Sequence, residues 1–381
     1  MSWPTVKIGD VATILPGFAF KSKHLGDAGV PVVKIGNISD DGSVDIENIQ
    51  YLPDNLQEKR YEKYALRNRD VIIAMTGATA GKVGRLKIDP DSYCFLNQRV
   101  AKFVPEKINA DFLWHIVGSP FYRTRFYALG GGAAQPNMSG PQIASVEIPL
   151  PPRPQQDRIA SILLAYDDLI ENNRRRIALL EEAARLLYRE WFIHFRFPGH
   201  EHTKIIDGVP EGWVNGIVED ALVLQRGFDL PVANRVEVDV PVYGSTGIVG
   251  YHNQAKVMTP TLITGRSGSL GQVILTNKPS WPLNTALWVK EFKAVSAMFG
   301  LFILRELNLV KYNGGASVPT LDRKVVHKLR QSIPPRQLMD EFETVVSPHF
   351  RQIDVLTEKN AQLAKARDLL LPRLMDGRIE V

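Results

Sequence analysis

Cysteine is nearly absent from this sequence, whose 381 residues include only Cys94. A single thiol cannot form an intrachain disulfide framework or supply the several cysteines of a structural zinc or iron–sulfur site. Apolar runs are short, and none approaches the roughly 18 residues of a membrane-spanning helix. Residues 1–10 also lack the charged-then-apolar pattern of a secretory signal. We therefore expect a cytoplasmic protein with no membrane partner.

A convincing catalytic centre is missing as well. The stretch Thr76–Gly84 resembles a phosphate-binding loop, but it has one residue too few between its glycines and no Ser or Thr to hold magnesium. The acid-x-Lys fragments Glu291–Lys293 and Asp322–Lys324 match part of many nuclease motifs without an evident partner carboxylate. His200–His202 is a weak metal candidate, because two histidines one residue apart in a loop seldom bind a metal. We expect a non-catalytic protein with no metal or cofactor of its own.

The composition is that of a folded protein, with 44% apolar and 23% charged residues. The length suits two or three domains of roughly 150 residues each. The net charge is +5 and the isoelectric point is about 9.1. This mild excess of positive charge favours polyanionic partners.

The chain contains two copies of one unit. A single offset of 183 positions relates the C-terminal parts of the copies over more than fifty residues, which is hard to obtain by chance. The N-terminal parts match at an offset of 210. The matches are Gly131-Gly132-Ala133 with Gly314-Gly315-Ala316, Pro136 with Pro319, Leu186-Leu187 with Leu369-Leu370, Trp3 with Trp213, Gly17-Phe18 with Gly227-Phe228, Ala78–Val83 with Gly268–Val273, and Leu96-Asn97 with Leu283-Asn284.

Each copy ends in a long helix whose seam residues are spaced alternately by three and four, which is typical of a coiled coil. The seam is Ile170, Asn173, Ile177, Leu180, Ala184, Leu187 and Trp191 in the first helix and Ile353, Leu356, Asn360, Leu363, Arg367, Leu370 and Leu374 in the second. We expect Asn173 and Asn360 to lie in adjacent layers opposite apolar residues, where they would set the register; otherwise they turn to solvent or a partner. Pro348 is expected to break or kink the second helix.

Short apolar runs between Gly, Asn, Asp and Pro clusters predict strands elsewhere, namely in Val32–Ile35, Val71–Met75, Leu262-Ile263 and Gln272–Leu275. Helices are expected over residues 109–126 and 296–307. The predicted fold class is α+β: two mixed α/β domains alternate with two long helices that pair as an antiparallel coiled coil, with pseudo-two-fold symmetry. The predicted segments are a first domain at 1–150, a helix at 151–197, a linker at 198–212, a second domain at 213–333 and a second helix at 334–381.

The excess positive charge lies on the domains and not on the helices. Residues 155–195 carry a net charge of −1 and residues 337–381 carry −2, which leaves about +8 on the rest of the chain. A phosphate backbone would therefore be attracted to the domains. The run Arg174-Arg175-Arg176 is most simply explained as a solvated helix face.

Two glycine-rich loops and two short polar segments are candidate DNA contacts. Arg266 and Gln272 have the bidentate geometry that reads guanine and adenine edges. The loops could equally be turns between strands, and the polar segments could equally make hydrogen bonds at strand ends. The candidates are Thr79, Lys82, Arg85, Asn97, Gln98 and Arg99 in the first copy and Arg266, Ser267, Ser269, Gln272, Asn284 and Thr285 in the second.

Three stretches, Ile148–Gln156, Leu179–Phe192 and Leu371–Ile379, resemble the specificity subunit of type I restriction–modification systems. The resemblance covers essentially the whole chain. It implies that each domain reads one half-site of a split, asymmetric target in double-stranded DNA. The helices would set the spacing and dock two methyltransferase subunits, which motor-nuclease subunits join. S-adenosylmethionine, ATP and magnesium would belong to those partners, and the complex would be a site-specific endonuclease and an adenine-specific DNA methyltransferase.

Three other functions remain open from the sequence. The chain could serve a related stand-alone or fused modification system, it could be an autonomous DNA-cleaving enzyme, or it could be a scaffold that does not bind DNA. Cleavage or methylation by the purified chain alone would indicate the enzyme. An absence of salt-dependent DNA affinity would indicate the scaffold.

Overall fold

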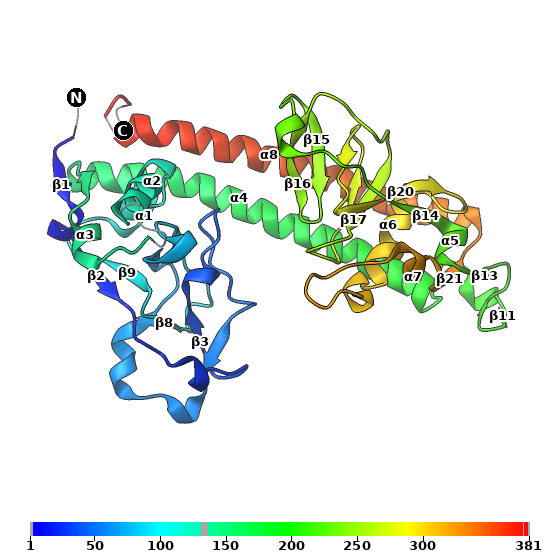
Figure 1. Cartoon of the computed structure of the whole chain (residues 1–381), viewed down its shortest axis with the longest axis horizontal. Coiled ribbons are helices and arrows are strands. Elements are labelled where there is room, and N and C mark those ends of the chain that lie inside the picture. The colour runs from blue at the N-terminus through cyan, green and yellow to red at the C-terminus, as the bar shows by residue number, and fades with distance from the viewer. Residues whose placement is uncertain (1–2, 131–135, 376, 380–381) are drawn as a thin grey trace. The chain divides into compact units, whose positions relative to one another are not determined.

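The computed structural model describes residues 3–130, 136–375 and 377–379 (Figure 1). Contacts divide the chain into two compact units: the first consists of the residues up to Asn173 and those from Glu358 onward, and the second of Arg174–Thr357. Each unit contains a mixed α/β domain and a stretch of both long helices, α4 (Arg153–Tyr188) and α8 (Arg336–Met375). The glycine-rich match that begins at Gly131 lies outside the described residues.

The domain of the first unit is built on two four-stranded sheets. The antiparallel sheet has the order β2 (Ala12–Pro16), β9 (Val100–Pro105), β6 (Val71–Ala74) and β7 (Val83–Arg85). The mixed sheet has the order β4 (Gln50–Leu52), β3 (Val30–Val33), β8 (Cys94–Leu96) and β5 (Ala65–Leu66), with β3 and β8 parallel. The ends of the domain are joined by β1 (Thr5–Lys7) and β10 (Glu147–Pro149).

The domain of the second unit has the same plan. Its antiparallel sheet has the order β14 (Leu222–Arg226), β20 (Ala286–Phe292), β17 (Thr261–Gly265) and β18 (Val273–Thr276). A three-stranded sheet contains β16 (Gly247–His252), β15 (Val240–Gly244) and β19 (Trp281–Pro282). Two further strand pairs are β13 (Val214–Ile217) with β21 (Arg330–Ile333) and β11 (Ile205–Ile206) with β12 (Val209–Pro210).

The internal repeat of the sequence is present in these topologies. Strands β2-β9-β6-β7 and β14-β20-β17-β18 occupy the same places in their sheets, β1-β10 matches β13-β21, and the parallel pair β3-β8 matches β15-β19. The four strands expected from apolar runs are confirmed as β3, β6, β17 and β18.

The repeated Gly-Phe dipeptides have a common steric reason. The backbone of Phe18 forms a parallel β-bridge with that of Asn97, and the backbone of Phe228 forms one with that of Leu283. A Cβ added to Gly17 would fall onto the carbonyl oxygen of Asn97. A Cβ on the matching glycine of the second unit would fall in the same way onto the carbonyl oxygen of Leu283. Only glycine permits this backbone approach.

Short helices cover the sheets in both domains. The described helices of the first domain are α1 (Ala110–Val117), α2 (Pro120–Leu129) and α3 (Gly140–Ala144), and those of the second are α5 (Val218–Ala221), α6 (Ala297–Glu306) and α7 (Arg323–His327). The single helix expected over residues 109–126 is wrong, because the chain turns at Gly118. Ser119 then caps α2, whose first residue is Pro120.

Each domain shares its core with the long helices. In the first unit Ile159 and Leu163 of α4 and Leu374 of α8 are buried in one cluster with Phe103 and Phe112. Full burial of such a side chain contributes about 1.5–3 kcal/mol. The helices are therefore part of each domain's interior.

The core of the second unit is aromatic where it meets the helices. Tyr188 of α4 stacks on Phe302 of α6 with ring centroids 5.2 Å apart, and Phe342 of α8 lies 6.0 Å from Tyr188. The aromatic end of the first helix therefore packs into a core. A single π-helical turn, Arg189–Ile193, ends that helix.

Within the first unit the two long helices run antiparallel. Asp167 contacts Arg367, and six residues further along α4 the Asn173 amide donates to the side-chain oxygen of Asn360 at 2.9 Å. Asn360 also donates to the carbonyl of Ile170 at 3.3 Å. The expectation that each Asn faces an apolar residue is therefore wrong, since the two amides satisfy each other.

The seam residues vary in burial. Ile170, Asn173, Leu356 and Leu374 are buried, and Ile177, Leu180, Leu187, Trp191, Ile353, Asn360, Leu363 and Leu370 are half-buried. The expected break at Pro348 is wrong, because α8 continues through it. Phe342 and Val346 anchor that part of α8 in the core of the second unit. This packing offsets the backbone hydrogen bond that proline cannot donate.

No helix in the described ranges combines the length and apolar character needed to cross a bilayer.

Candidate nucleic-acid interface

Three segments of the first unit meet beyond the end of β6. The amide of Met75 donates to the carbonyl of Arg99, and the amide of Gly77 donates to Pro136, both at 2.9 Å. A backbone bridge joins Thr76 to Asn137. These segments line an open hollow of about 540 Å³, which we call the strand-end site. Its lining residues are Met75, Thr76, Gly77, Gln98, Arg99, Pro136, Asn137 and Met138. Because the backbone groups are paired internally, the exposed side chains of this strand-end site remain available to a ligand.

The second unit repeats this strand-end site with different side chains. The amide of Arg266 donates to Thr285 at 2.8 Å, and Ser267 bridges Thr320. Because Leu283 takes the place of Asn97 beside the Gly-Phe backbone, Asn284 corresponds to Gln98 and Thr285 to Arg99. The sequence match of Asn97 with Asn284 is therefore one residue out of register.

The candidates of the second unit are partly engaged in local bonds. The guanidinium of Arg266 donates to the carbonyl of Asn284 at 3.1 Å, and the Asn284 amide donates to Asp229. Arg266 is half-buried, whereas Ser269 and Gln272 are exposed. The guanidinium of Arg266 therefore links two segments of the strand-end site by a hydrogen bond.

The three candidates of the first glycine-rich loop do not share one surface. Thr79 is half-buried and donates to the carbonyl of Thr76 at 3.3 Å, and Lys82 pairs with Asp40 at 2.8 Å. Arg85 is buried at 9% exposure and pairs with Asp111. We expected Arg85 to face DNA, but its side chain points into the domain. It compensates a carboxylate of α1 inside the domain.

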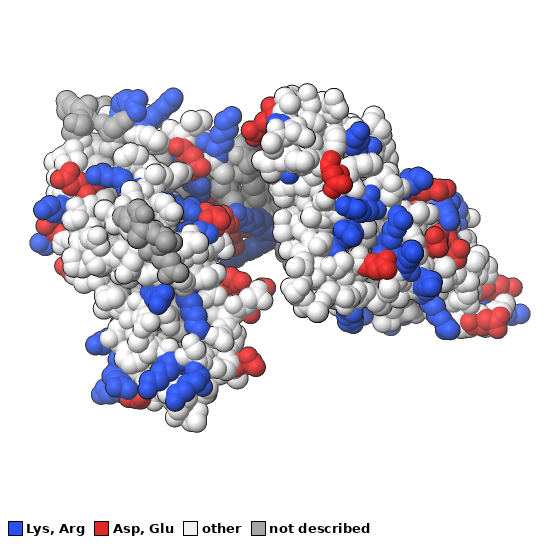
Figure 2. Space-filling view, in the orientation of Figure 1, with Lys and Arg blue, Asp and Glu red and all other residues white. Residues whose placement is uncertain are grey.

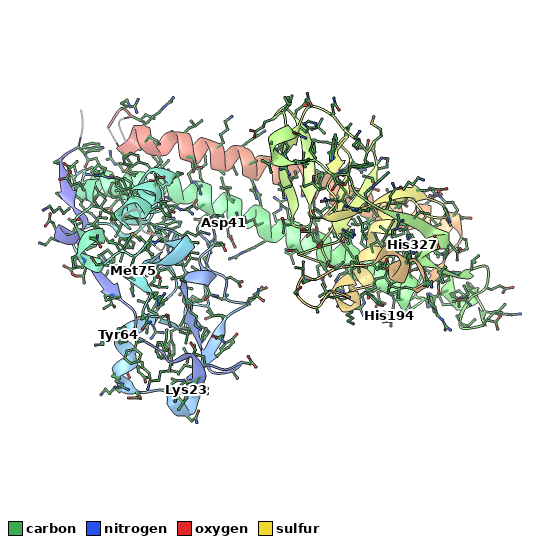
Figure 3. The ribbon with its side chains drawn as sticks, viewed as in Figure 1. Lys23, Asp41, Tyr64, Met75, His194 and His327 are labelled. Carbon is green, nitrogen blue, oxygen red and sulfur yellow. The ribbon has the colours of Figure 1, made fainter. Side chains whose placement is uncertain are left out.

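A cluster of aromatic rings surrounded by exposed cations lies elsewhere on the first domain. Its rings are Phe18, Phe20, Tyr61, Tyr64, Tyr93 and Phe95, and we call this cluster, with its exposed cations, the aromatic lobe. Phe20, Tyr61 and Phe95 are buried in it, and the other three rings are half-buried. The exposed cations are Lys21, Lys23, Lys59, Arg60, Lys63 and Arg67. Figure 2 shows Lys and Arg side chains gathered at this end of the unit, and Figure 3 places Lys23 and Tyr64 there.

Cations of the aromatic lobe sit over its rings. The guanidinium of Arg60 lies 5.5 Å from the centre of the Phe18 ring, and the ammonium of Lys63 lies 4.9 Å from that of Tyr64. The alternation of cations and tyrosines in Lys59–Tyr64 is the sequence signal of this cluster. The exposed cations suit a nucleic-acid backbone, and only the half-buried rings of Phe18, Tyr64 and Tyr93 are partly accessible beside them.

Exposed lysines also occur on the second domain, at Lys290 on β20, at Lys293 directly after that strand, and at Lys324 and Lys328 around α7. The acid-x-Lys fragments lie here, but the carboxylate of Asp322 caps α7 by accepting from the Lys324 amide at 2.9 Å. In the part of the chain that the structure describes, no group of His, Cys, Asp and Glu is arranged to hold a metal ion. The exposed lysines suit binding of a polyanion.

Comparisons with known proteins agree with this geometry. Residues 1–182 match the type I restriction modification DNA specificity domain. The MjaIX specificity subunit of a type I restriction enzyme from Methanocaldococcus jannaschii is 23% identical over 417 residues, covering 100% of this chain and 94% of that protein. The MjaVIII specificity subunit from the same organism is 31% identical over 188 residues, 48% of this chain and 44% of that protein, so this match spans less than half of either.

A solved structure shares the fold. The type I restriction–modification S subunit from M. genitalium matches 98% of this chain and 96% of its own, with a TM-score of 0.57 and 16% identity. Residues 1–182 therefore resemble the type I restriction modification DNA specificity domain, and the whole chain is similar in sequence to the MjaIX specificity subunit.

Proposed function

We propose that the chain is the DNA sequence-specificity subunit of a type I restriction–modification complex and reads an asymmetric, bipartite target. The observation that carries the proposal is the strand-end site, which recurs in both units on one backbone plan with different side chains. Gln98 and Arg99 in the first unit are replaced by Asn284 and Thr285 in the second. Two readers of one shape but different chemistry suit two different half-sites.

The long helices would hold the readers apart. In this proposal α4 and α8 pair as an antiparallel coiled coil along their whole length, which relates the two units by a pseudo-two-fold axis. Such a rod fixes the number of bases between the half-sites, so those bases need not be read. The antiparallel contacts of Asp167 and Asn173 with α8 support this arrangement.

The partners would dock on the same helices. Exposed apolar side chains occur at positions that correspond in the repeat, Ile162 with Val345 and Leu186 with Leu369. A single exposed apolar residue is ordinary on a protein surface, so the support for a protein contact here is that these residues recur at matched positions of the two helices. Two methyltransferase subunits would bind there, and motor-nuclease subunits would join through them. These cytoplasmic partners would supply S-adenosylmethionine, ATP and magnesium, and with them both enzymatic activities.

Mapping of methylated adenines tests the proposal in cells that carry the chain with its methyltransferase partner. The expected result is one asymmetric motif of two short half-sites at a fixed separation. Gln98→Ala with Arg99→Ala should then alter the first half-site only, and Asn284→Ala with Thr285→Ala the second only. A contiguous motif, or cleavage or methylation by the purified chain alone, would overturn the proposal.

A further inference from the structure

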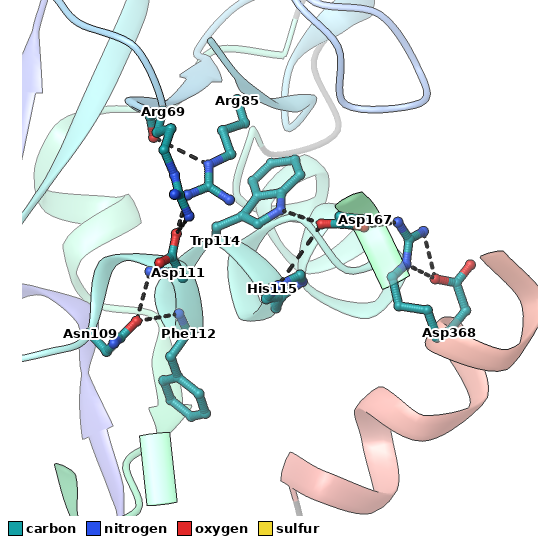
Figure 4. A network of polar contacts seen from close by, with 10 residues as sticks. Arg69, Arg85, Asn109, Asp111, Phe112, Trp114, His115, Asp167 and Asp368 are labelled. Atoms are coloured by element: carbon teal, nitrogen blue, oxygen red, sulfur yellow. Dashed lines mark hydrogen bonds and ion pairs between the residues drawn. The ribbon is translucent and has the colours of Figure 1, made fainter. Parts of the chain in front are cut away.

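Asp167 lies where the first domain meets both long helices (Figure 4). Its carboxylate on α4 accepts from the indole of Trp114 on α1 at 3.4 Å and from the guanidinium of Arg367 on α8 at 2.6 Å. The Nε2 of His115 is 4.0 Å from the same carboxylate. One charged group on α4 therefore contacts two other elements of the first unit, α1 and α8.

The contact continues into the sheet of the first domain. The guanidinium of Arg85 on β7 lies 5.9 Å from the Trp114 ring and pairs with Asp111, one turn before Trp114 on α1. A Cβ added to Gly42 would lie 2.9 Å from the Trp114 ring, so that loop also confines the indole. A displacement at Asp167 would therefore reach the strands through Trp114.

The residues that correspond to this network in the second unit are apolar, although α6 also pairs with the end of the first long helix through Arg305 with Glu181 and Glu306 with Arg189, both at 3.4 Å. Asn109 and Ser296 cap α1 and α6 in the same way, which makes Phe302 the counterpart of His115. The offset of 183 makes Phe350 the counterpart of Asp167 and Ala184 that of Arg367. Phe302 and Phe350 pack edge to face with ring centroids 5.9 Å apart, and Ala184 is fully buried.

The contacts of Asp167 and the packing of Phe302 on Phe350 differ in how much displacement of the domain they tolerate. Apolar packing is non-directional, so a contact of rings tolerates small shifts. A partly buried carboxylate has few geometries that satisfy all its partners, and losing one partner leaves charge unpaired. The carboxylate of Asp167 therefore fixes an angle and a distance more strictly than the rings that stand in its place in the second unit.

We propose that Asp167 is a positioning residue that holds the first domain in one orientation on the helical pair and so sets how strictly the spacer length is read. This inference rests on the proposed function. It predicts that loss of the Asp167 charge relaxes the choice of spacer and leaves both half-sites unchanged, because no base-reading side chain is altered.

The test uses the complex of the chain with its methyltransferase partner and duplexes whose spacer is native or one base pair longer or shorter. Asp167→Asn keeps the shape of the side chain and removes its charge. Asp168→Asn is the matched control, because Asp168 is the exposed neighbour and loses the same charge. The ratio of methylation rates on native and altered spacers is measured, and the melting temperature reports whether each complex is intact.

Asp167→Asn should reduce the preference for the native spacer at least tenfold, while Asp168→Asn keeps it and both retain the half-site motif. An intact Asp167→Asn complex with the wild-type preference would overturn the inference. If that variant does not fold, Asp167→Asn with Arg367→Gln removes both charges and is judged in the same way. A wild-type complex that ignores the spacer would instead overturn the proposed function.

Discussion

Acidification from about pH 7 to about pH 5 should destabilise the first unit through His115. This side chain is 6% exposed. Its pKa is lowered to about 4, mainly by burial; the charges of Arg85 and Arg367 act in the same direction, and the charge of Asp167 opposes them. In the unfolded chain the imidazole has its ordinary pKa of about 6.5. The unfolded state therefore takes up the proton first, and stability falls as the pH drops from 6.5 towards 4.

The size of the effect follows from these two pKa values. Because the unfolded state binds the proton more strongly, the free energy of unfolding falls by about 2 kcal/mol at pH 5 and by about 3 kcal/mol below pH 4. His327 has the same sign, because burial lowers its pKa also. The carboxylate of Asp111 affects the free energy of unfolding only at lower pH, because pairing with Arg85 and Arg69 outweighs the effect of its burial and lowers its pKa. The interval from about pH 7 to about pH 5 therefore favours the histidines over the carboxylates with lowered pKa, while Asp354, whose pKa burial raises, acts in the opposite direction.

Urea unfolding at both pH values measures the effect. His115→Phe, which installs the residue that the second unit has at Phe302, should remove about 2 kcal/mol of the loss between the two pH values. His202→Gln removes an imidazole from a short surface helix and serves as the control. If His115→Phe retains the full wild-type loss, the assignment to His115 is refuted.

Three further outcomes are expected. One heptad inserted into α4 and another at the facing position of α8 should lengthen the methylated spacer by about three base pairs, since seven residues add about 10 Å, and leave the half-sites unchanged. Lys59→Gln with Lys63→Gln should weaken DNA binding and reduce the slope of log affinity against log salt by about two, whereas Lys365→Gln on α8 should not, as measured by titration at several salt concentrations. Gly17→Ala should lower the unfolding free energy by more than 2 kcal/mol in urea, because its Cβ meets a carbonyl oxygen, while Gly26→Ala, which meets nothing within 4 Å, should change it little.

The repeat and the strands could be predicted because they depend on local pattern. Constant offsets revealed two copies, and short apolar runs such as Val71–Met75 mark strands wherever turn residues bound them. The long helices followed from their spacing. These features need no knowledge of what lies across the fold.

Features that depend on distant partners could not be predicted. An offset relates Asn173 to a position in the other copy, but in an antiparallel pair it does not give the facing residue, which is Asn360. Arg85 looked accessible on its loop, and its burial depends on Asp111 of a helix 26 positions away. The aromatic lobe joins residues near 20, 60 and 95, which only the folded sheets bring together.

The shared core of domain and helices determines where a graft between relatives can be cut. A chimera that exchanged only residues up to 150 would leave Ile159 and Leu163 of α4 and Leu374 of α8 pressed against a foreign interior. A poor fit at one such side chain costs about 1–3 kcal/mol. The transferable cassette is therefore discontinuous in the chain: a new recognition domain must travel with the start of one helix and the end of the other.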